Sequence, residues 1–199
     1  MIGYLRRGKL ITAQAFTSNL EGAAASLRAP SGVPDAGPAD LGQLISETLA
    51  LFPDHPPARA QVLYLGQGTN VRPHDLLLER AIRQAQRRGV PVWVVHIPPG
   101  PGGGIPEAGR RELPPEPSPA PGSPVSYAEA YLARLSEETG GDTFGLGRQP
   151  VGLERYLDRF RSLLDRQYLV EIDAPEPRPG SRLRVEIPRR DLRLLHPRN

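Results

Sequence analysis

The 199-residue sequence contains no cysteine, one lysine and no long apolar run. Without cysteine, the chain has no disulfide, no thiolate metal site and no cysteine nucleophile. No stretch approaches the roughly 18 apolar residues of a transmembrane helix, and residues 1–10 lack the apolar region of a signal peptide. Blocks of five or six like charges are also absent, so the net charge of +3 is a weak argument for nucleic acid. We therefore expect neither nucleic-acid binding nor a membrane span, and the compartment stays open.

Proline and glycine are abundant instead, with 24 and 21 residues. They are concentrated in residues 98–125, a stretch with almost nothing to bury. This composition is typical of a surface loop with polyproline character. Such a loop could also serve as a ligand for a proline-binding module, but we interpret it as a loop insertion.

Two short apolar runs predict strands that are buried on both faces. They are residues 61–65 (QVLYL) and residues 90–97 (VPVWVVHI). Strands of this kind belong to parallel sheets covered by helices. Further strands are expected within residues 2–17, as a hairpin around a turn at residues 6–9, at residues 143–146, and as a C-terminal hairpin of residues 167–173 and 182–187.

Helical periodicity and capping patterns predict five helices, at residues 19–27, 41–52, 75–88, 126–138 and 153–164. Three of the helix starts carry an N-cap pattern: Ser18 with Glu21, Asp40 with Gln43, and Ser126 with Glu129. In this pattern a side-chain oxygen accepts a hydrogen bond from a free backbone N–H of the first turn. Gly89 is the expected residue after the third helix.

Together these elements predict an α/β fold with a doubly wound, mostly parallel sheet, helices on both faces and an added C-terminal β-hairpin. We expect one domain over residues 1–167, which contains the 98–125 loop, and a hairpin extension over residues 168–199 packed on it. Ligands of such sheets bind at the carboxyl ends of the strands. Residues 66–70 follow a strand and lie in that place.

Five segments occur in a familiar order: AFTSNLEGAAASL, VLYLGQGTN, LLERAIRQAQRRGVPVWVVHI, YLARLSEETGGDTF and YLDRFRSLLDRQYLVEIDAP. In this order they resemble a von Willebrand factor type A domain of the acidobacterial "VWFA-related" kind. The resemblance covers nearly the whole chain. It implies a Rossmann-like fold and an adhesion-type function, in a family whose members are often exported.

The chain departs from this family at its metal-ion-dependent adhesion site, which takes ligands from three loops. The resemblance begins at the family's second strand, so the Asp-x-Ser-x-Ser loop after the first strand has no counterpart. Ala39 occupies the position of the family's threonine, and Gln67 that of its third-loop aspartate. A neutral amide is a poor replacement for a carboxylate around Mg²⁺ or Mn²⁺. The resemblance therefore implies a degenerate site, and we expect no bound metal and no cofactor.

The candidate partner-binding residues are those at the strand end together with a nearby helix cap: Gly66, Gln67, Gly68, Thr69, Asn70 and Asp40. Gly66-Gln67-Gly68 can be a tight turn that needs glycine, or a residual site at which Gln67, Thr69 and Asn70 offer hydrogen bonds. One G-x-G is weak evidence for nucleotide binding. The four histidines have no metal-ligand spacing, and no nucleophile, base and orienting group occur in a recognisable context.

We therefore predict a non-enzymatic module that binds another protein. The alternative is a metal-dependent type A domain whose first strand and Asp-x-Ser-x-Ser loop lie upstream of this chain. A third reading is an α/β hydrolase or nucleotide-binding enzyme. If the first strand is missing, residues 4–6 and 62–65 lose the neighbour between them. They should then touch directly or leave a gap, and the chain could self-associate.

Overall fold

The computed structural model describes residues 1–6, 8–27, 40–57, 59–66, 76–96, 124–145, 153–168, 186 and 195–197. Within these residues the fold is mixed α/β, as predicted, and contains two small sheets. None of the described helices is long and apolar enough to cross a membrane.

The first sheet is an antiparallel hairpin of β1 (Ile2–Arg6) and β2 (Lys9–Gln14). Gly8 lies in its turn with φ of 72°, a conformation that glycine adopts at little cost. The predicted N-terminal hairpin is thereby confirmed.

The second sheet is parallel, in the order β3–β4–β5, and consists of β3 (Val62–Gly66), β4 (Val92–His96) and β5 (Thr143–Gly145). Every residue of the central strand β4 is buried. Val92 and Val94 face one core cluster, whereas Trp93 and Val95 face the other. The continuous apolar run of this strand is thus explained by helices on both sides.

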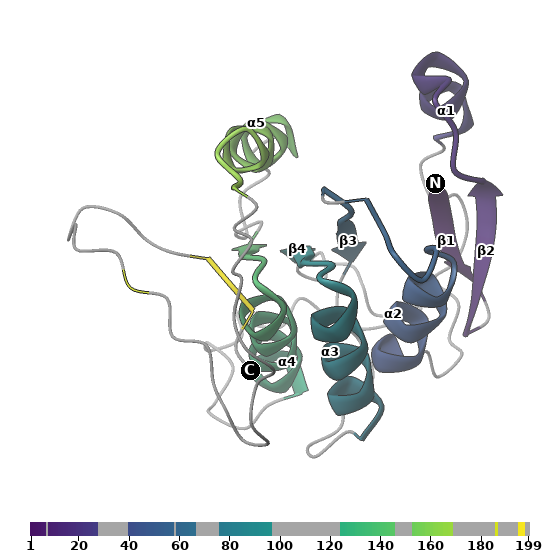
Figure 1. Ribbon diagram of the computed structural model, residues 1–199. Coiled ribbons are helices and arrows are strands. Elements are labelled where there is room, and N and C mark those ends of the chain that lie inside the picture. Colours follow the sequence, from purple (N-terminus) through teal and green to yellow (C-terminus); the bar gives the residue numbers. More distant parts are fainter. Residues whose placement is uncertain are drawn as a thin grey trace, which may run out of the picture.

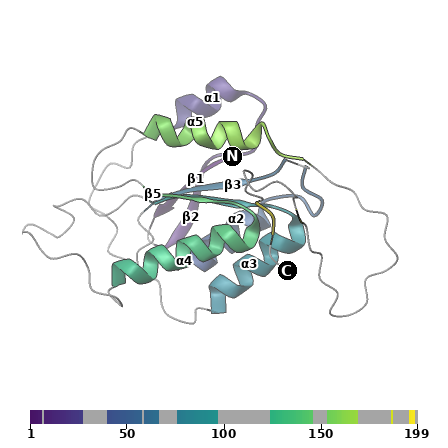
Figure 2. The same cartoon turned by 90° about the vertical axis from the view of Figure 1, so that its left-hand side faces the viewer.

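Three helices cover one face of the parallel sheet. They are α2 (Leu41–Ala50), α3 (Leu76–Arg88) and α4 (Pro124–Thr139). Figure 2 shows them below the strands, while α5 (Leu153–Leu164) lies above, on the same side as α1 (Leu20–Ser26). The same layers are visible from the other direction in Figure 1. The apolar faces of α2, α3 and α4 form the larger core, and α5 forms the smaller one around Trp93.

The first predicted helix start is wrong by one residue. Asn19, not Ser18, is the N-cap of α1, and its Oδ1 accepts a hydrogen bond from the Gly22 N–H at 2.9 Å. Three candidate caps stand in a row here, and the Thr17 side chain instead accepts from the Asn19 N–H at 3.0 Å. Glu21 is therefore in the first turn without the reciprocal role predicted for it.

The start of α4 is also earlier than predicted. The helix begins at Pro124, so Ser126 and Glu129 lie inside it and do not form the predicted capping box. Proline suits the first turn because its missing N–H has no partner there in any case. The loop predicted for residues 98–125 therefore ends before residue 124. Residues 98–123 lie outside the described residues, as does the predicted C-terminal hairpin except for Gln167, Tyr168 and Glu186.

The remaining helix predictions agree with the structure. Asp40 caps α2, and Gly89 follows α3 with φ of 61°. The helix α4 ends at Thr139, where Gly140 has φ of 86°. Each glycine takes the left-handed conformation that ends a helix.

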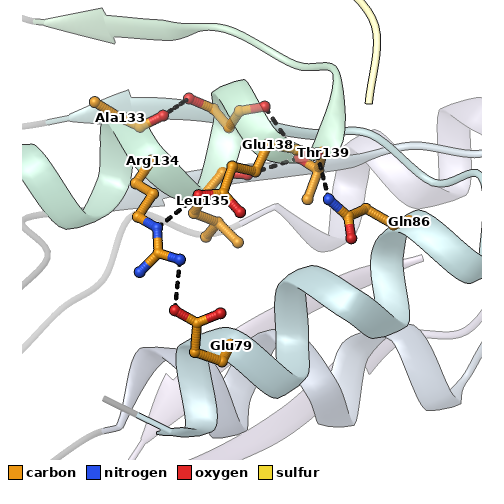
Figure 3. A network of polar contacts seen from close by, with 8 residues as sticks. Glu79, Gln86, Ala133, Arg134, Leu135, Glu138 and Thr139 are labelled. Atoms are coloured by element: carbon orange, nitrogen blue, oxygen red, sulfur yellow. Dashed lines mark hydrogen bonds and ion pairs between the residues drawn. The ribbon is translucent and has the colours of Figure 1, made fainter. Parts of the chain in front are cut away.

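The helices α3 and α4 are joined on their outer side by polar contacts (Figure 3). Arg134 reaches Glu138 at 2.6 Å and Glu79 of α3 at 2.5 Å, and Gln86 donates to the Glu138 carbonyl at 2.9 Å. The hydrogen bond to Glu138 raises the pKa of Arg134 above its ordinary value. Because these side chains are partly exposed, the ion pairs are worth at most about 1 kcal/mol.

A buried hydroxyl connects the end of α4 to the start of β4. The Thr139 Oγ1 accepts a hydrogen bond from the Val92 N–H at 3.1 Å and donates to the Leu135 carbonyl at 2.8 Å. This strand N–H has no other partner among the described residues.

We expect Thr139→Val to destabilise the protein by about 1–3 kcal/mol, because valine leaves the buried Val92 N–H unpaired at nearly unchanged volume. Thr139→Ser is the matched control, since it keeps the hydroxyl and loses only a methyl group. Urea unfolding of both variants measures the difference. A valine variant as stable as wild type would show that Val92 finds another acceptor.

Candidate partner-binding surface

The carboxyl ends of β3 and β4 define the end of the sheet at which the candidate residues lie. Gly66 is the last residue of β3 and is paired in register with His96, the last residue of β4. The strand β3 leads to α3 through residues 67–75, so the start of α3 is also at this end. Of the predicted site, Gln67, Gly68, Thr69 and Asn70 lie outside the described residues.

Gly66 makes a close contact that the sequence does not predict. It is not among the described glycines with positive φ, so no left-handed turn demands glycine there. A Cβ atom at this position would instead collide with the Tyr64 hydroxyl. Glycine lets the Tyr64 ring lie along the end of its own strand, packed against the larger core.

Asp40 lies at the same end of the fold through the packing of two helix starts. Its Oδ1 accepts a hydrogen bond from the Gln43 N–H at 3.0 Å, which is the predicted cap. Two residues on, a Cβ on Gly42 would lie 2.5 Å from the Leu77 and Leu78 backbone. The starts of α2 and α3 therefore touch, and Asp40 and Gly66 belong to one end of the molecule. The cap occupies one Asp40 oxygen.

A histidine and a carboxylate also meet at this end, which the sequence did not indicate. His96 is 5% exposed, and its Nδ1 lies 3.8 Å from Oε1 of Glu129 on α4. This distance is that of an ion pair and is too long for a hydrogen bond. No sequence pattern indicates this contact, because the two residues are far apart in the chain and the spacing of Glu129 from Ser126 favours a capping box.

The described residues at this end do not form a metal-binding group. Among them, no three His, Cys, Asp or Glu side chains are grouped closely enough to hold a metal ion. What this end does offer is apolar surface. Leu65 is 42% exposed, and Leu76 and Leu77 are 79% and 36% exposed. The three leucines stand on either side of residues 67–75.

No protein-family model matches the chain, and no curated protein or solved structure is significantly similar to it. The resemblance to type A domains therefore rests on the order of the sequence motifs.

Proposed function

We propose that the chain is a non-enzymatic protein-binding module on a type A-like, doubly wound α/β scaffold with a degenerate metal site. The partner binds at the carboxyl ends of the parallel strands, over residues 66–70 and the neighbouring start of α2 at Asp40. Ala39 and Gln67 replace two of the family's metal-site residues, so recognition depends on apolar contact and hydrogen bonds and not on a bridging cation.

The observation that carries this proposal is the exposed apolar start of α3 at the strand ends. Leu76 and Leu77 open this helix, and both are exposed. Exposed leucines grouped at one place, beside polar residues, are typical of a protein-binding surface. Elsewhere α3 is strongly amphipathic, with Leu78 and Ala81 buried and arginines outside, so its exposed start is a local exception.

We expect Leu76→Arg to weaken partner binding by about 10-fold or more, because it places a charge in the exposed apolar start of α3. The matched control is Leu157→Arg on α5, which changes another exposed leucine on the other face of the sheet. Its affinity should stay within about 2-fold of wild type.

The partner is first identified by photo-crosslinking. Two variants of the protein carry a photoreactive amino acid at position 76 or at position 157. Each is irradiated in an extract of the source organism, and the proteins crosslinked to it are identified by mass spectrometry. The dissociation constant of the purified pair is then measured calorimetrically for both arginine variants. Equal adducts from the two positions, or unchanged affinity of Leu76→Arg, would refute the proposed site.

A further inference from the structure

Among the described strands, β1 pairs with β2 alone, and β3 is an outer strand of the parallel sheet. Figure 1 shows the hairpin beyond β3, on the side away from β4, with β1 as the nearer of its two strands. The described strands of the two sheets are not hydrogen-bonded to each other. Direct pairing of residues 4–6 with residues 62–65, one of the two expected outcomes, is therefore not observed, and the strands lie apart.

The ladder of β3 shows which backbone groups are left over. Val62 is in register with Val92, and its N–H donates to the Pro91 carbonyl at 3.0 Å. In a parallel ladder alternate residues bond to the same neighbour, so Val62, Tyr64 and Gly66 face β4. The N–H and C=O groups of Leu63 and Leu65 point to the opposite, free edge.

The residues of β3 itself lack the features that protect outer strands. Natural edges are blunted by charged side chains, proline or a bulge. The β3 sequence VLYLG contains neither proline nor charge. Exposed apolar side chains also lie on the neighbouring elements: Leu5, Ile11, Phe16, Leu20 and Leu27. The helix α1 buries none of its residues.

The charge of the hairpin indicates what kind of strand the edge accepts. Residues 1–20 contain three cations and no acidic residue. Arg6 and Lys9 stand directly opposite each other across the hairpin, and both are exposed. Like charges at such a cross-strand pair are unfavourable, and neither side chain has an ion pair among the described residues. A carboxylate beside them would remove this repulsion.

We propose that the free edge of β3, together with β1, binds an extended, apolar segment of a partner protein that carries an acidic residue. The backbone of the segment pairs with Leu63 and Leu65, and its carboxylate lies beside Arg6 and Lys9. Strand addition of this kind is a common mode of peptide recognition. The inference rests on the proposed protein-binding function and names the partner's binding element. A second copy of the chain fits less well, because its own edge strand VLYLG has no acidic residue to offer.

The probe is a short fluorescent peptide of alternating valine and threonine with glutamate at both ends. A second peptide has lysine at both ends, and a third carries N-methyl groups at alternate residues. We expect the glutamate peptide to bind at least about 10-fold more tightly than the lysine peptide, and the N-methyl peptide not to bind. The double variant Arg6→Glu with Lys9→Glu should instead bind the lysine peptide more tightly than the glutamate peptide.

Leu65→Pro tests the edge from the side of the protein. Proline removes the Leu65 N–H, which faces the free edge and takes no part in the β3–β4 ladder, so the fold should survive. We expect the affinity for the glutamate peptide to fall at least about 10-fold. Leu65→Ile keeps both the N–H and an apolar side chain of equal size, and should bind within about 3-fold of wild type. Circular dichroism confirms that both variants are folded; if the proline variant is not, the N-methyl peptide makes the same test on wild type.

Three results would overturn the inference. The first is that the glutamate and lysine peptides bind equally or not at all. The second is that a folded Leu65→Pro variant or the N-methyl peptide binds normally. The third is that the wild-type protein sediments as a dimer and the Leu65→Pro variant as a monomer, which would show that the β3 edge binds a second copy of the chain. The proposed function is judged separately, because Leu76→Arg changes the strand-end surface and leaves the β3 edge intact.

Discussion

Trp93→Ala is expected to destabilise the protein by about 3–5 kcal/mol, the largest loss we expect from any one truncation. Trp93 is 1% exposed at the centre of the smaller core. Its ring lies 5.3 Å from that of Phe160 on α5 and 6.3 Å from that of Phe144 on β5, measured between centroids. Alanine would leave a cavity between the sheet and α5, which also packs on this cluster through Tyr156 and Leu163.

A conservative variant separates the two contributions of the indole ring. Its Nε1 is buried and has no hydrogen-bond partner among the described residues, which is itself unfavourable. Trp93→Phe removes this unpaired group and keeps an aromatic ring, so it should cost much less than the alanine change. Both variants are compared with wild type by urea unfolding followed in the far-ultraviolet circular dichroism. A loss below about 1.5 kcal/mol for Trp93→Ala would show that α5 is held by other contacts.

The burial of Trp93 is also where sequence reasoning worked best. An apolar run without alternation predicts a strand covered on both faces, and β4 has this environment. The apolar spacing of α2 was equally informative, because Leu41, Leu44, Ile45 and Leu49 are all buried. Patterns of this kind are set by the core, and a core side chain has few alternatives to its position.

Predictions that depended on one local hydrogen bond succeeded less often. Asp40 is a cap as predicted, but Ser18 is displaced by Asn19, and Ser126 lies inside a helix that begins at Pro124. Several side chains in a row can cap a helix at similar free energy. The sequence therefore restricts the helix start to a few residues and does not select one of them.

The candidate site was the least predictable part of the molecule. Its location at the strand ends follows from fold class, and Gly66 and Asp40 do lie at that end. The contact between His96 and Glu129 could not be foreseen, because it depends on how α4 packs against the end of β4. The open edge of β3 has the same origin: strand order is a property of the assembled sheet, and no local pattern in VLYLG reports it.

Gly141→Ala is expected to cost about 3 kcal/mol, at the upper end of the range for overpacking. Gly141 follows the end of α4, where the Gly141 N–H donates to the Ser136 carbonyl at 2.8 Å. A Cβ atom there would collide with the Val92 carbonyl oxygen and lie 3.3 Å from the Trp93 backbone nitrogen. Both neighbours are backbone atoms of the central strand, so neither can turn aside as a side-chain tip would. Relief would require β4 or the end of α4 to move.

Gly89→Ala provides the control that separates this collision from backbone strain. Gly89 has φ of 61°, which disfavours alanine, but a Cβ there meets nothing within 4 Å. That variant should lose only about 1–2 kcal/mol, the cost of a left-handed non-glycine residue. Gly141 is not among the described glycines with positive φ, so its larger loss would come from contact alone. Thermal and urea unfolding of the two variants decide the point: if Gly141→Ala is no less stable than Gly89→Ala, the close approach of α4 to the central strand is not a constraint on the fold.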